Sequence, residues 1–406
     1  MKFAHIADAH LGGWREPALR EANAQSFITC IDKIIEQRVD FLLIAGDLFN
    51  TSVPPIDALK LAVQKLNDLK RAGIPVYLIP GSHDASPSGK TMLDVLEEAG
   101  LFINVVKGEV IDGKLRLKFT VDPKTGAKLT GLLGKKGGLD KHYYADLDRT
   151  HLENETGFKI FMFHCALTEC KPKELQDMDA LSISLFPKGF DYYAGGHVHV
   201  IDRVSIGNYK NVIYPGPVFP NNFAEIEKLK QGTFVLYNDG IITHVPIALH
   251  PVIPIVIDAN GRTTTEVEEL LRQQPVSVSN AIVTVRVSGT LSQGKPSDIQ
   301  FQTLLQQTLD HGAYAILRNT SSLTSKEFEA ITVDQNSVED VEAALIREHS
   351  GKVFGEQEAT LINTLMQALQ TERNEGEKVS DFEKRIIGDA LQALARIPSS
   401  ATPASG

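Results

Sequence analysis

Short polar motifs at the ends of apolar, strand-like runs constrain this chain more than any other feature of its sequence. Two of them place an Asp or a His two residues before a His, at Asp8-Ala9-His10 and His197-Val198-His199. The others are Gly46-Asp47, Gly81-Ser82-His83-Asp84 and Phe163-His164. Polar side chains that follow separate buried strands gather at one edge of a sheet, where they form a crevice. The sequence therefore predicts an α/β fold with one polar site.

Strand and helix signals alternate along the first 200 residues. Fully apolar runs, typical of strands buried on both faces, occupy residues 41–45 and 76–79. Further strands are expected at residues 2–7, 159–163, 192–194, 211–214 and 233–237. Apolar residues at helical spacing predict helices at 18–37, 56–71 and 91–99. Residues 101–133 are β-rich, and residues 134–157 are expected to be an exposed, glycine-rich connection.

A change of composition near His250-Pro251 predicts a domain boundary. We expect a first domain at 1–248, a small α/β capping domain at 249–325 and a helical region at 326–406 that ends in a flexible tail. The second domain has the signal order strand, helix, strand, helix, strand. Amphipathic helices are expected at 359–370 and 382–397. The predicted fold class is thus an α/β layered β-sandwich flanked by helices, followed by a small α/β domain and C-terminal helices.

The donor types in these motifs favour a pair of metal ions. Residues two apart on an extended backbone point the same way, which would bring Asp8 beside His10 and His197 beside His199. Mixed carboxylate and imidazole donors suit Mn²⁺, Fe or Zn²⁺ better than Mg²⁺ or Ca²⁺. An Asp at the centre of such a set can bridge two ions, as in dinuclear hydrolytic centres. The motifs together predict a two-metal phosphoesterase site.

The ordered motifs resemble those of the calcineurin-like metallophosphoesterases. In finer detail, Phe3–Gly12, Ile44–Phe49 and Tyr214-Pro215-Gly216-Pro217 are similar to the archaeal and bacterial DNA double-strand-break repair nucleases of the SbcD type, which are related to the eukaryotic meiotic-recombination-eleven nuclease. The resemblance covers about residues 1–240 by motif and the remainder by layout. It implies a Mn²⁺-dependent DNA exonuclease or endonuclease with two divalent ions per chain. It also implies a homodimer, through helices 56–71 and 91–99, and a Rad-fifty-type coiled-coil ATPase as partner of the C-terminal helices.

Transferred residue by residue, the family's ligands fall into two sets that share one carboxylate. The resemblance implies that the first ion is held by Asp8, His10, Asp47 and His199. It implies that the second is held by Asp47, Ser82, His164 and His197. A hydroxide between the ions would attack the backbone phosphorus, His83 would protonate the leaving oxygen, and Asp84 would either orient that imidazole or cap the loop.

Two residues depart from the family's pattern. The family usually has Asn where Ser82 stands, and a hydroxyl reaches less far than an amide oxygen. Its nucleases commonly have a catalytic His where Asn50 stands, and Asn hydrogen-bonds a phosphate without carrying a proton. Two alternatives to a DNA nuclease therefore stay open. One is a phosphoesterase acting on a cyclic nucleotide or a phosphoprotein, and the other is a catalytically weak DNA-binding or scaffold subunit.

Charge is distributed unevenly along the chain. The formal net charge of −10 argues against a general nucleic-acid binder, but residues 107–141 hold nine Lys and Arg against four Asp and Glu. Lys135-Lys136-Gly137-Gly138 in this stretch could track phosphates or could be a surface loop. Ser88-Gly89-Lys90-Thr91 lacks the first glycine of a phosphate-binding loop, so we interpret it as a turn before a helix.

Cellular location is constrained only by simple features. No apolar run is long enough to cross a membrane, and the first residues enter a strand signal without a basic and apolar leader. The three cysteines, Cys30, Cys165 and Cys170, lie in unrelated contexts and predict no disulfide framework. We expect a cytoplasmic protein without membrane contact.

Overall fold

The computed structural model describes residues 1–86, 89–135, 141–171, 178–273, 278–326, 358–369, 371 and 379–395. It divides into two compact units, Met1–Ser325 and Lys326–Gly406. Among the described residues, no helix is both long and apolar enough to cross a membrane. Parts of the two motifs considered for phosphate binding, Ser88 and Lys136 to Gly138, lie outside the described residues.

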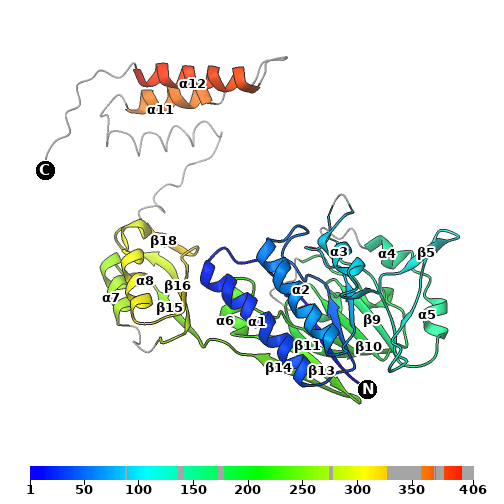
Figure 1. The fold of residues 1–406 in the computed structure, drawn as a ribbon. Coiled ribbons are helices and arrows are strands. Elements are labelled where there is room, and N and C mark those ends of the chain that lie inside the picture. The colour runs from blue at the N-terminus through cyan, green and yellow to red at the C-terminus, as the bar shows by residue number, and fades with distance from the viewer. Residues whose placement is uncertain are drawn as a thin grey trace. The chain divides into compact units, whose positions relative to one another are not determined.

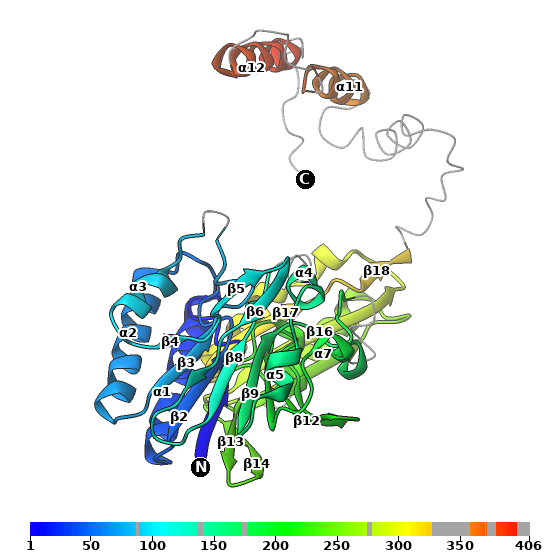
Figure 2. The ribbon, with the colours of Figure 1, turned by 90° about the vertical axis from the view of Figure 1, so that its right-hand side faces the viewer.

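Two six-stranded sheets form the centre of the first unit (Figures 1 and 2). The first has the order β14-β13-β1-β2-β3-β4, in which β1 to β4 run parallel and β13 pairs antiparallel with β1. Its strands are β1 (Lys2–Ile6), β2 (Phe41–Ala45), β3 (Val76–Ile79), β4 (Ile103–Asn104), β13 (Gly232–Asn238) and β14 (Ile241–Ile247).

The second sheet has the order β11-β12-β10-β9-β8-β7, and its central strands β12, β10, β9 and β8 are also parallel. Its strands are β7 (Thr120–Val121), β8 (Lys128–Gly131), β9 (Lys159–His164), β10 (Tyr192–Gly196), β11 (Ile201–Ile206) and β12 (Tyr209–Pro215). A separate hairpin is formed by β5 (Gly108–Ile111) and β6 (Lys114–Leu117). The predicted layered α/β fold is confirmed.

The alternation of side chains along the central strands sorts them into two cores. In β2, Phe41 and Leu43 pack into a core between the two sheets, whereas Leu42 and Ile44 face a core under the helices. Because a strand's side chains alternate between faces, a fully apolar strand can serve two buried layers at once. This explains why residues 41–45 and 76–79 are continuously apolar.

Helices cover the outer faces of both sheets. The first sheet is covered by α1 (Pro17–Glu36) and α2 (Ile56–Arg71), which pack side by side, together with α3 (Met92–Glu98) (Figure 2). Helix α3 begins at Met92 and is capped by Thr91, whose side chain accepts from the Asp94 amide, so the expected helix start after Lys90 is confirmed. In the two helices expected at a dimer interface, Ala62, Leu66, Leu93 and Leu96 are buried in this chain's own core.

The prediction for residues 134–157 is confirmed in part, since most of the described residues are exposed or half-buried. It did not include helices α4 (Lys141–Ala145) and α5 (Thr150–Asn154), which lie on the outer face of the second sheet. Tyr144 and Leu152 are buried there, and the Tyr144 ring stacks on Phe186 with ring centroids 5.1 Å apart. Few apolar residues suffice because each is large and each reaches the core.

Residues 252–325 form a smaller sheet of parallel strands with two helices. The elements are β15 (Val252–Asp258), α7 (Thr264–Arg272), β16 (Ile282–Leu291), α8 (Phe301–Asp310), β17 (Ala315–Asn319) and β18 (Leu323–Ser325). This region belongs to the same compact unit as the sandwich. Helix α6 (Phe223–Leu229) lies against β15 and β16, and Glu227 of α6 pairs with Arg286 of β16 at 2.6 Å. A domain boundary at 248/249 stays a prediction.

The second unit contains two described helices, α11 (Glu358–Leu369) and α12 (Val379–Ala395), which pack against each other. Ile387, Leu391 and Leu394 of α12 are largely exposed. They are spaced by four and three residues, so they lie on one face of the helix.

Candidate metal centre

The carboxyl ends of five parallel strands, three from the first sheet and two from the second, meet at one edge of the sandwich. Asp8 and His10 follow β1, Asp47 follows β2, and Ser82 and His83 follow β3. From the second sheet, His164 ends β9, and His197 and His199 follow β10. A cavity of about 320 Å³ lies among them and is lined by most of these residues, including His10, Asp47, Ser82, His83, His197 and His199.

The Asp and His donors fall into two compact groups. Asp8, His10 and His199 form one, and Asp47, His164 and His197 form the other, with ligand atoms within 4.8 Å of one another in each group. A third combination joins His10, Asp47 and His83. The structure therefore brings together the six Asp and His residues predicted as ligands and His83, the predicted proton donor. Ser82 lies at the edge of the second group, where its hydroxyl is 3.4 Å from Oδ2 of Asp47.

Glycines in the motifs allow the strand ends to approach this closely. A Cβ on Gly46 would stand 2.2 Å from Nδ1 of His164, and Gly46 has φ +88°. A Cβ on Gly81 would stand 2.3 Å from Oδ1 of Asp47. Both contacts are far below any tolerable separation, so only glycine fits at either position.

The backbone is strained at the predicted donors. Asp8, His10, Asp47, His197 and His199 all have positive φ, between 43° and 93°. Such conformations cost a non-glycine residue roughly 1–3 kcal/mol and cluster at functional sites. The expected extended backbone at Asp8 and His10 is therefore wrong. These side chains converge because each turns out of its strand through a left-handed residue.

Backbone groups fix the orientation of several donors. Nδ1 of His164 lies 2.8 Å from the carbonyl oxygen of Ala45, so this nitrogen carries the proton and Nε2 faces the carboxylates. Nδ1 of His83 lies 2.8 Å from the carbonyl oxygen of Asn50 in the same way. The amide of His83 donates to Oδ1 of Asp47 at 2.7 Å. These contacts engage Nδ1 of His164 and of His83 and leave Nε2 of each ring available as a ligand or proton donor.

Asp84 holds the loops rather than the His83 ring. Its carboxylate accepts from the backbone amides of Leu48, Phe49 and Gly81, at 3.0–3.3 Å. Of the two roles left open for Asp84, these are the contacts of a loop cap. Burial, reinforced by the charge of Asp47, raises the pKa of Asp84 to about 6. The side-chain oxygen of Asn50 lies close to Gly13, together with that of Asn221.

The charges and hydrogen bonds of this site fit bound cations. Nε2 of His164 makes no hydrogen bond although it lies 3.1 Å from Oδ2 of Asp47. Nε2 of His10 and Nε2 of His199 face each other at 3.0 Å. With neutral imidazoles protonated on Nδ1, acceptor atoms would be buried against each other, which is costly unless a proton or a metal ion supplies positive charge between them. The donor set therefore matches divalent metal ions with mixed nitrogen and oxygen ligands.

The pKa values of the site's histidines also indicate that the site favours positive charge. Burial alone would lower the pKa of His164, but Asp47 and Asp8 outweigh it and raise it to about 10. Burial opposes the same effect at His199, where Asp8 and Glu225 raise the pKa to about 9. Burial lowers the pKa of His10 to about 3 and that of His197 to about 4. Protons on His164 and His199 occupy positions where a metal ion would bind.

Sequence reasoning missed Glu225. Its Oε1 lies 2.9 Å from Nδ1 of His199, and the two are 26 residues apart in the chain. The pattern Asn222-x-x-Glu225 could have been recognised as a helix start, since Asn222 caps α6 by accepting from the Glu225 amide. Nothing in that pattern indicates His199 as a partner.

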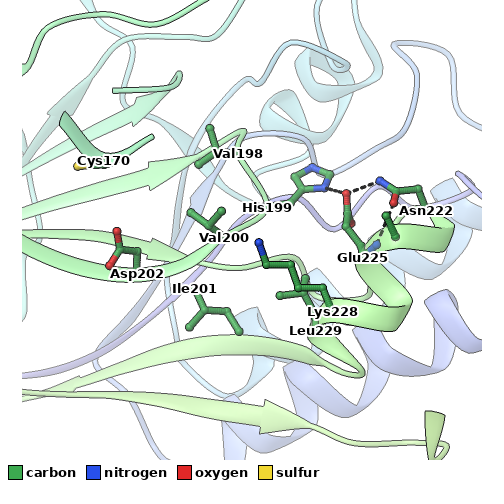
Figure 3. Close-up of a pocket in the computed structure, with 11 residues that line it drawn as sticks. Cys170, Val198, His199, Val200, Ile201, Asp202, Asn222, Glu225, Lys228 and Leu229 are labelled. Atoms are coloured by element: carbon green, nitrogen blue, oxygen red, sulfur yellow. Dashed lines mark hydrogen bonds and ion pairs between the residues drawn. The ribbon is translucent and has the colours of Figure 1, made fainter. Parts of the chain in front are cut away.

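A larger cavity of about 660 Å³ also borders His199 (Figure 3). Its walls are largely apolar and include Val198, Val200, Ile201 and Leu229, with Lys228 and Asp202 also present. Val198, His199, Asn222 and Glu225 line both cavities.

Comparison with known proteins agrees with this fold. Residues 1–201 match the family described as calcineurin-like phosphoesterase, and this part of the chain belongs to that family. Its relatives include proteins named DNA double-strand break repair protein Mre11. The one from Methanococcus maripaludis is 32% identical over 249 residues, which cover 57% of this chain and 60% of the relative.

Two further relatives of that name give similar values. The protein from Archaeoglobus fulgidus is 30% identical, covering 60% of this chain and 54% of the relative. The protein from Methanopyrus kandleri is 32% identical, covering 56% of this chain and 51% of the relative. The chain thus aligns with between half and three-fifths of the length of these relatives. The predicted resemblance to nucleases of the SbcD type is confirmed at the level of the family.

Proposed function

We propose that this protein is a two-metal DNA phosphodiesterase, an exonuclease or endonuclease that acts in double-strand-break repair. The observation that carries the proposal is the pair of donor groups, Asp8 with His10 and His199, and Asp47 with His164 and His197. Asp47 would also contribute to the first ion, since its Oδ2 lies 3.7 Å from Nε2 of His10. Ser82 would complete the second. Mn²⁺ is the ion we propose, because the donors mix imidazole nitrogen with carboxylate oxygen.

When bound, the two ions supply an activated water and neutralise the charge that develops on the phosphate. The residues of the chain position these events. His83 is the proton donor to the leaving oxygen, because its Nδ1 is fixed on the Asn50 carbonyl and its ring lies beside that of His10, with centroids 4.8 Å apart. Asp84 keeps the loops after β2 and β3 together. The amide of Asn50 would hydrogen-bond a phosphate oxygen at the edge of the site.

Basic residues beside the metal centre support DNA as the substrate. Lys135 and Lys141, from the stretch with excess positive charge, line a third cavity together with His164 and His197. Lys135 donates to the Tyr143 hydroxyl at 2.7 Å, and Lys141 pairs with Asp179. These contacts hold both ammonium groups near the site, where they would bind phosphates on either side of the bond that is cut. Elsewhere in the stretch, Lys118, Lys124 and Lys128 pair with acidic residues.

The protein partners are proposed from exposed apolar surface. A homodimer would form through α2 and α3, where Ile56 and Val95 are 84% and 58% exposed. A Rad-fifty-type coiled-coil ATPase would bind the second unit through Ile387, Leu391 and Leu394 of α12. Apolar residues that share one exposed helix face mark a contact surface more often than isolated ones.

A catalytically weak DNA-binding or scaffold subunit is the second candidate. It is favoured by Ser82, whose hydroxyl makes a long contact of 3.4 Å to Asp47 and would be a poor substitute for an amide ligand. A phosphoesterase for another substrate class, such as a cyclic nucleotide or a phosphoprotein, is the third.

One set of assays separates these candidates. Labelled single- and double-stranded DNA and the small phosphodiester bis-p-nitrophenyl phosphate are each incubated with the protein and Mn²⁺, alongside Asp47→Asn as the inactive control. A DNA nuclease cuts both labelled substrates in an Mn²⁺-dependent way. Hydrolysis of the small diester alone would favour a phosphoesterase for another substrate class. Binding of DNA without cleavage of DNA or of the small diester would favour the scaffold subunit.

A further inference from the structure

Glu225 holds the imidazole of His199 through the nitrogen that faces away from the other donors. Oε1 of Glu225 lies 2.9 Å from Nδ1 of His199 (Figure 3). Nε2 of His199 lies 3.7 Å from Oδ1 of Asp8. A carboxylate accepts hydrogen bonds, so Nδ1 carries a proton and Nε2, which faces Asp8 and His10, is the nitrogen that can bind an ion. His164 and His83 receive the same kind of support from neutral backbone carbonyls. His199 receives it from a charged group.

Glu225 is itself held firmly. Its second oxygen accepts from the Asn221 amide at 2.7 Å, and the Asn222 side chain donates to Oε1. Its side chain is 19% exposed and that of His199 15%, so both are largely protected from water. Helix α6 is anchored at its other side, where Glu227 pairs with Arg286 and the Arg286 guanidinium lies over the Phe223 ring at 5.0 Å. The carboxylate is therefore fixed before any ion binds.

We propose that Glu225 is a positioning residue that orients His199 for metal binding and strengthens its Nε2 as a ligand. This inference rests on the metal centre proposed above. A carboxylate behind a ligand histidine fixes the ring and makes its metal-binding nitrogen more basic, and loss of such a group typically weakens metal binding about 10- to 100-fold. The ion held by Asp8, His10 and His199 is the one that would be affected.

The large cavity beside Glu225 provides a distinctive test. Because Glu225 lines this cavity, a small anion could enter the space left by Glu225→Ala. Formate carries the missing carboxylate and is small enough for that space. Rescue by formate would show that metal binding depends on a hydrogen-bond acceptor beside Nδ1 of His199. Rescue would not occur if Glu225 only stabilised helix α6.

The experiment compares Mn²⁺ binding by calorimetry in the wild type, Glu225→Ala, Glu225→Gln and the control variant Glu227→Gln of the full chain. Glu227→Gln loosens the anchor of α6 on Arg286 without removing any contact of His199 or Glu225. Thermal unfolding in EDTA checks that every variant is folded. We expect Glu225→Ala to bind one of two ions 10- to 100-fold more weakly and formate to restore part of that loss, with no effect of formate on the wild type. Glu225→Gln should lie between, and Glu227→Gln should bind like the wild type.

A spectroscopic measurement gives a second criterion. In the zinc-loaded protein, which is diamagnetic, the ¹⁵N resonances of His199 should show a proton on Nδ1 and the metal on Nε2. That pattern should be lost or mixed in Glu225→Ala. Wild-type affinity in Glu225→Ala, or an equal loss in Glu227→Gln, would overturn the inference while leaving the metal centre intact. A wild type that binds no Mn²⁺ would instead overturn the proposed function.

Discussion

The backbone N–H of His197 donates to both carboxylate oxygens of Asp8, with each N···O distance 3.0 Å. This contact joins the end of β10 in the second sheet to the end of β1 in the first. It also holds the Asp8 carboxylate in a buried site beside the negatively charged Asp47. Asp8 is therefore both a link between the sheets and a candidate ligand, and these two roles can be separated.

Replacing Asp8 with Asn should abolish most of the stabilisation by Mn²⁺ while leaving the fold largely intact. The amide oxygen can still accept from His197, while one negative charge near Asp47 is removed. With Mn²⁺ at 100 times its dissociation constant, the wild type should gain about 2.7 kcal/mol of unfolding free energy, and Asp8→Asn should lose most of that gain. Turnover should fall by about 100-fold or more, which corresponds to at least about 2.7 kcal/mol. Thermal unfolding with and without EDTA measures the first effect. An undiminished Mn²⁺ response would exclude Asp8 as a ligand.

Metal binding should release protons at neutral pH. In the metal-free protein the pKa values of His164 and His199 are raised to about 10 and 9, so both imidazoles are charged at pH 7.5, and a metal ion can bind only when the protons leave. Mn²⁺ affinity should therefore rise with pH up to about 9 to 10. Calorimetry in two buffers of different ionisation enthalpy counts the released protons, and equal binding heats in both would contradict this prediction.

The stability of the metal-free protein should change with pH in the opposite direction. Both pKa values lie above the ordinary value of 6.5, so these charged imidazoles contribute their full stabilisation below about pH 6.5. That contribution is lost as the pH rises through about 9 and 10. Denaturant unfolding in EDTA between pH 6.5 and 10 should show a falling free energy of unfolding. A parallel rise in metal affinity and metal-free stability would be inconsistent with this assignment.

Replacing His83 with Gln should slow cleavage while the ions stay bound. Its Nδ1 is directed to the Asn50 carbonyl, and removal of a proton donor typically costs 10²- to 10⁴-fold in rate. Turnover on labelled DNA and metal content by elemental analysis are measured on the same preparation. Because His83 also lies in a donor combination with His10 and Asp47, loss of an ion would identify it as a ligand instead.

Replacing Ser82 with Asn should strengthen the second ion site. An amide oxygen reaches further than the hydroxyl, which now lies 3.4 Å from Asp47. We expect Mn²⁺ to bind there about tenfold more tightly, roughly 1.4 kcal/mol. Ser82→Ala is the matched control and should weaken binding at the same site. If all three proteins bind both ions equally, residue 82 is not a ligand.

Much of the fold could be predicted because its strongest signals are local. The continuous apolar run at Phe41–Ala45 and the helical spacing at Ile56–Arg71 gave elements with the same bounds in the structure. The two short helices within residues 134–157 could not be predicted, because they have no repeating apolar pattern. Each is held by a large buried side chain, Tyr144 in one and Leu152 in the other. Burial there depends on which surface happens to face them, and sequence spacing does not contain that information.

The candidate site was predicted with correct neighbours but for a partly wrong geometrical reason. Asp8 and His10 converge through left-handed backbone rather than along an extended strand. The position of Glu225 could not be predicted, because its partner His199 lies in a different element and only the folded chain brings them together. Local sequence indicates which residue types can bind an ion. The groups that orient them come from tertiary contacts.

The docking of residues 252–325 on helix α6 has a practical consequence for anyone wishing to study the phosphoesterase part by itself. Trp14, Phe219 and Ile226 share one apolar cluster with Ile282 and Ala315, and the Tyr314 hydroxyl donates to the Ala18 carbonyl at 2.9 Å. A fragment stopped at residue 248 would expose that cluster to water and leave Glu227 without Arg286. Such a truncated protein should be prone to aggregate, and any loss of cleavage it showed would say little about whether the removed part touches DNA.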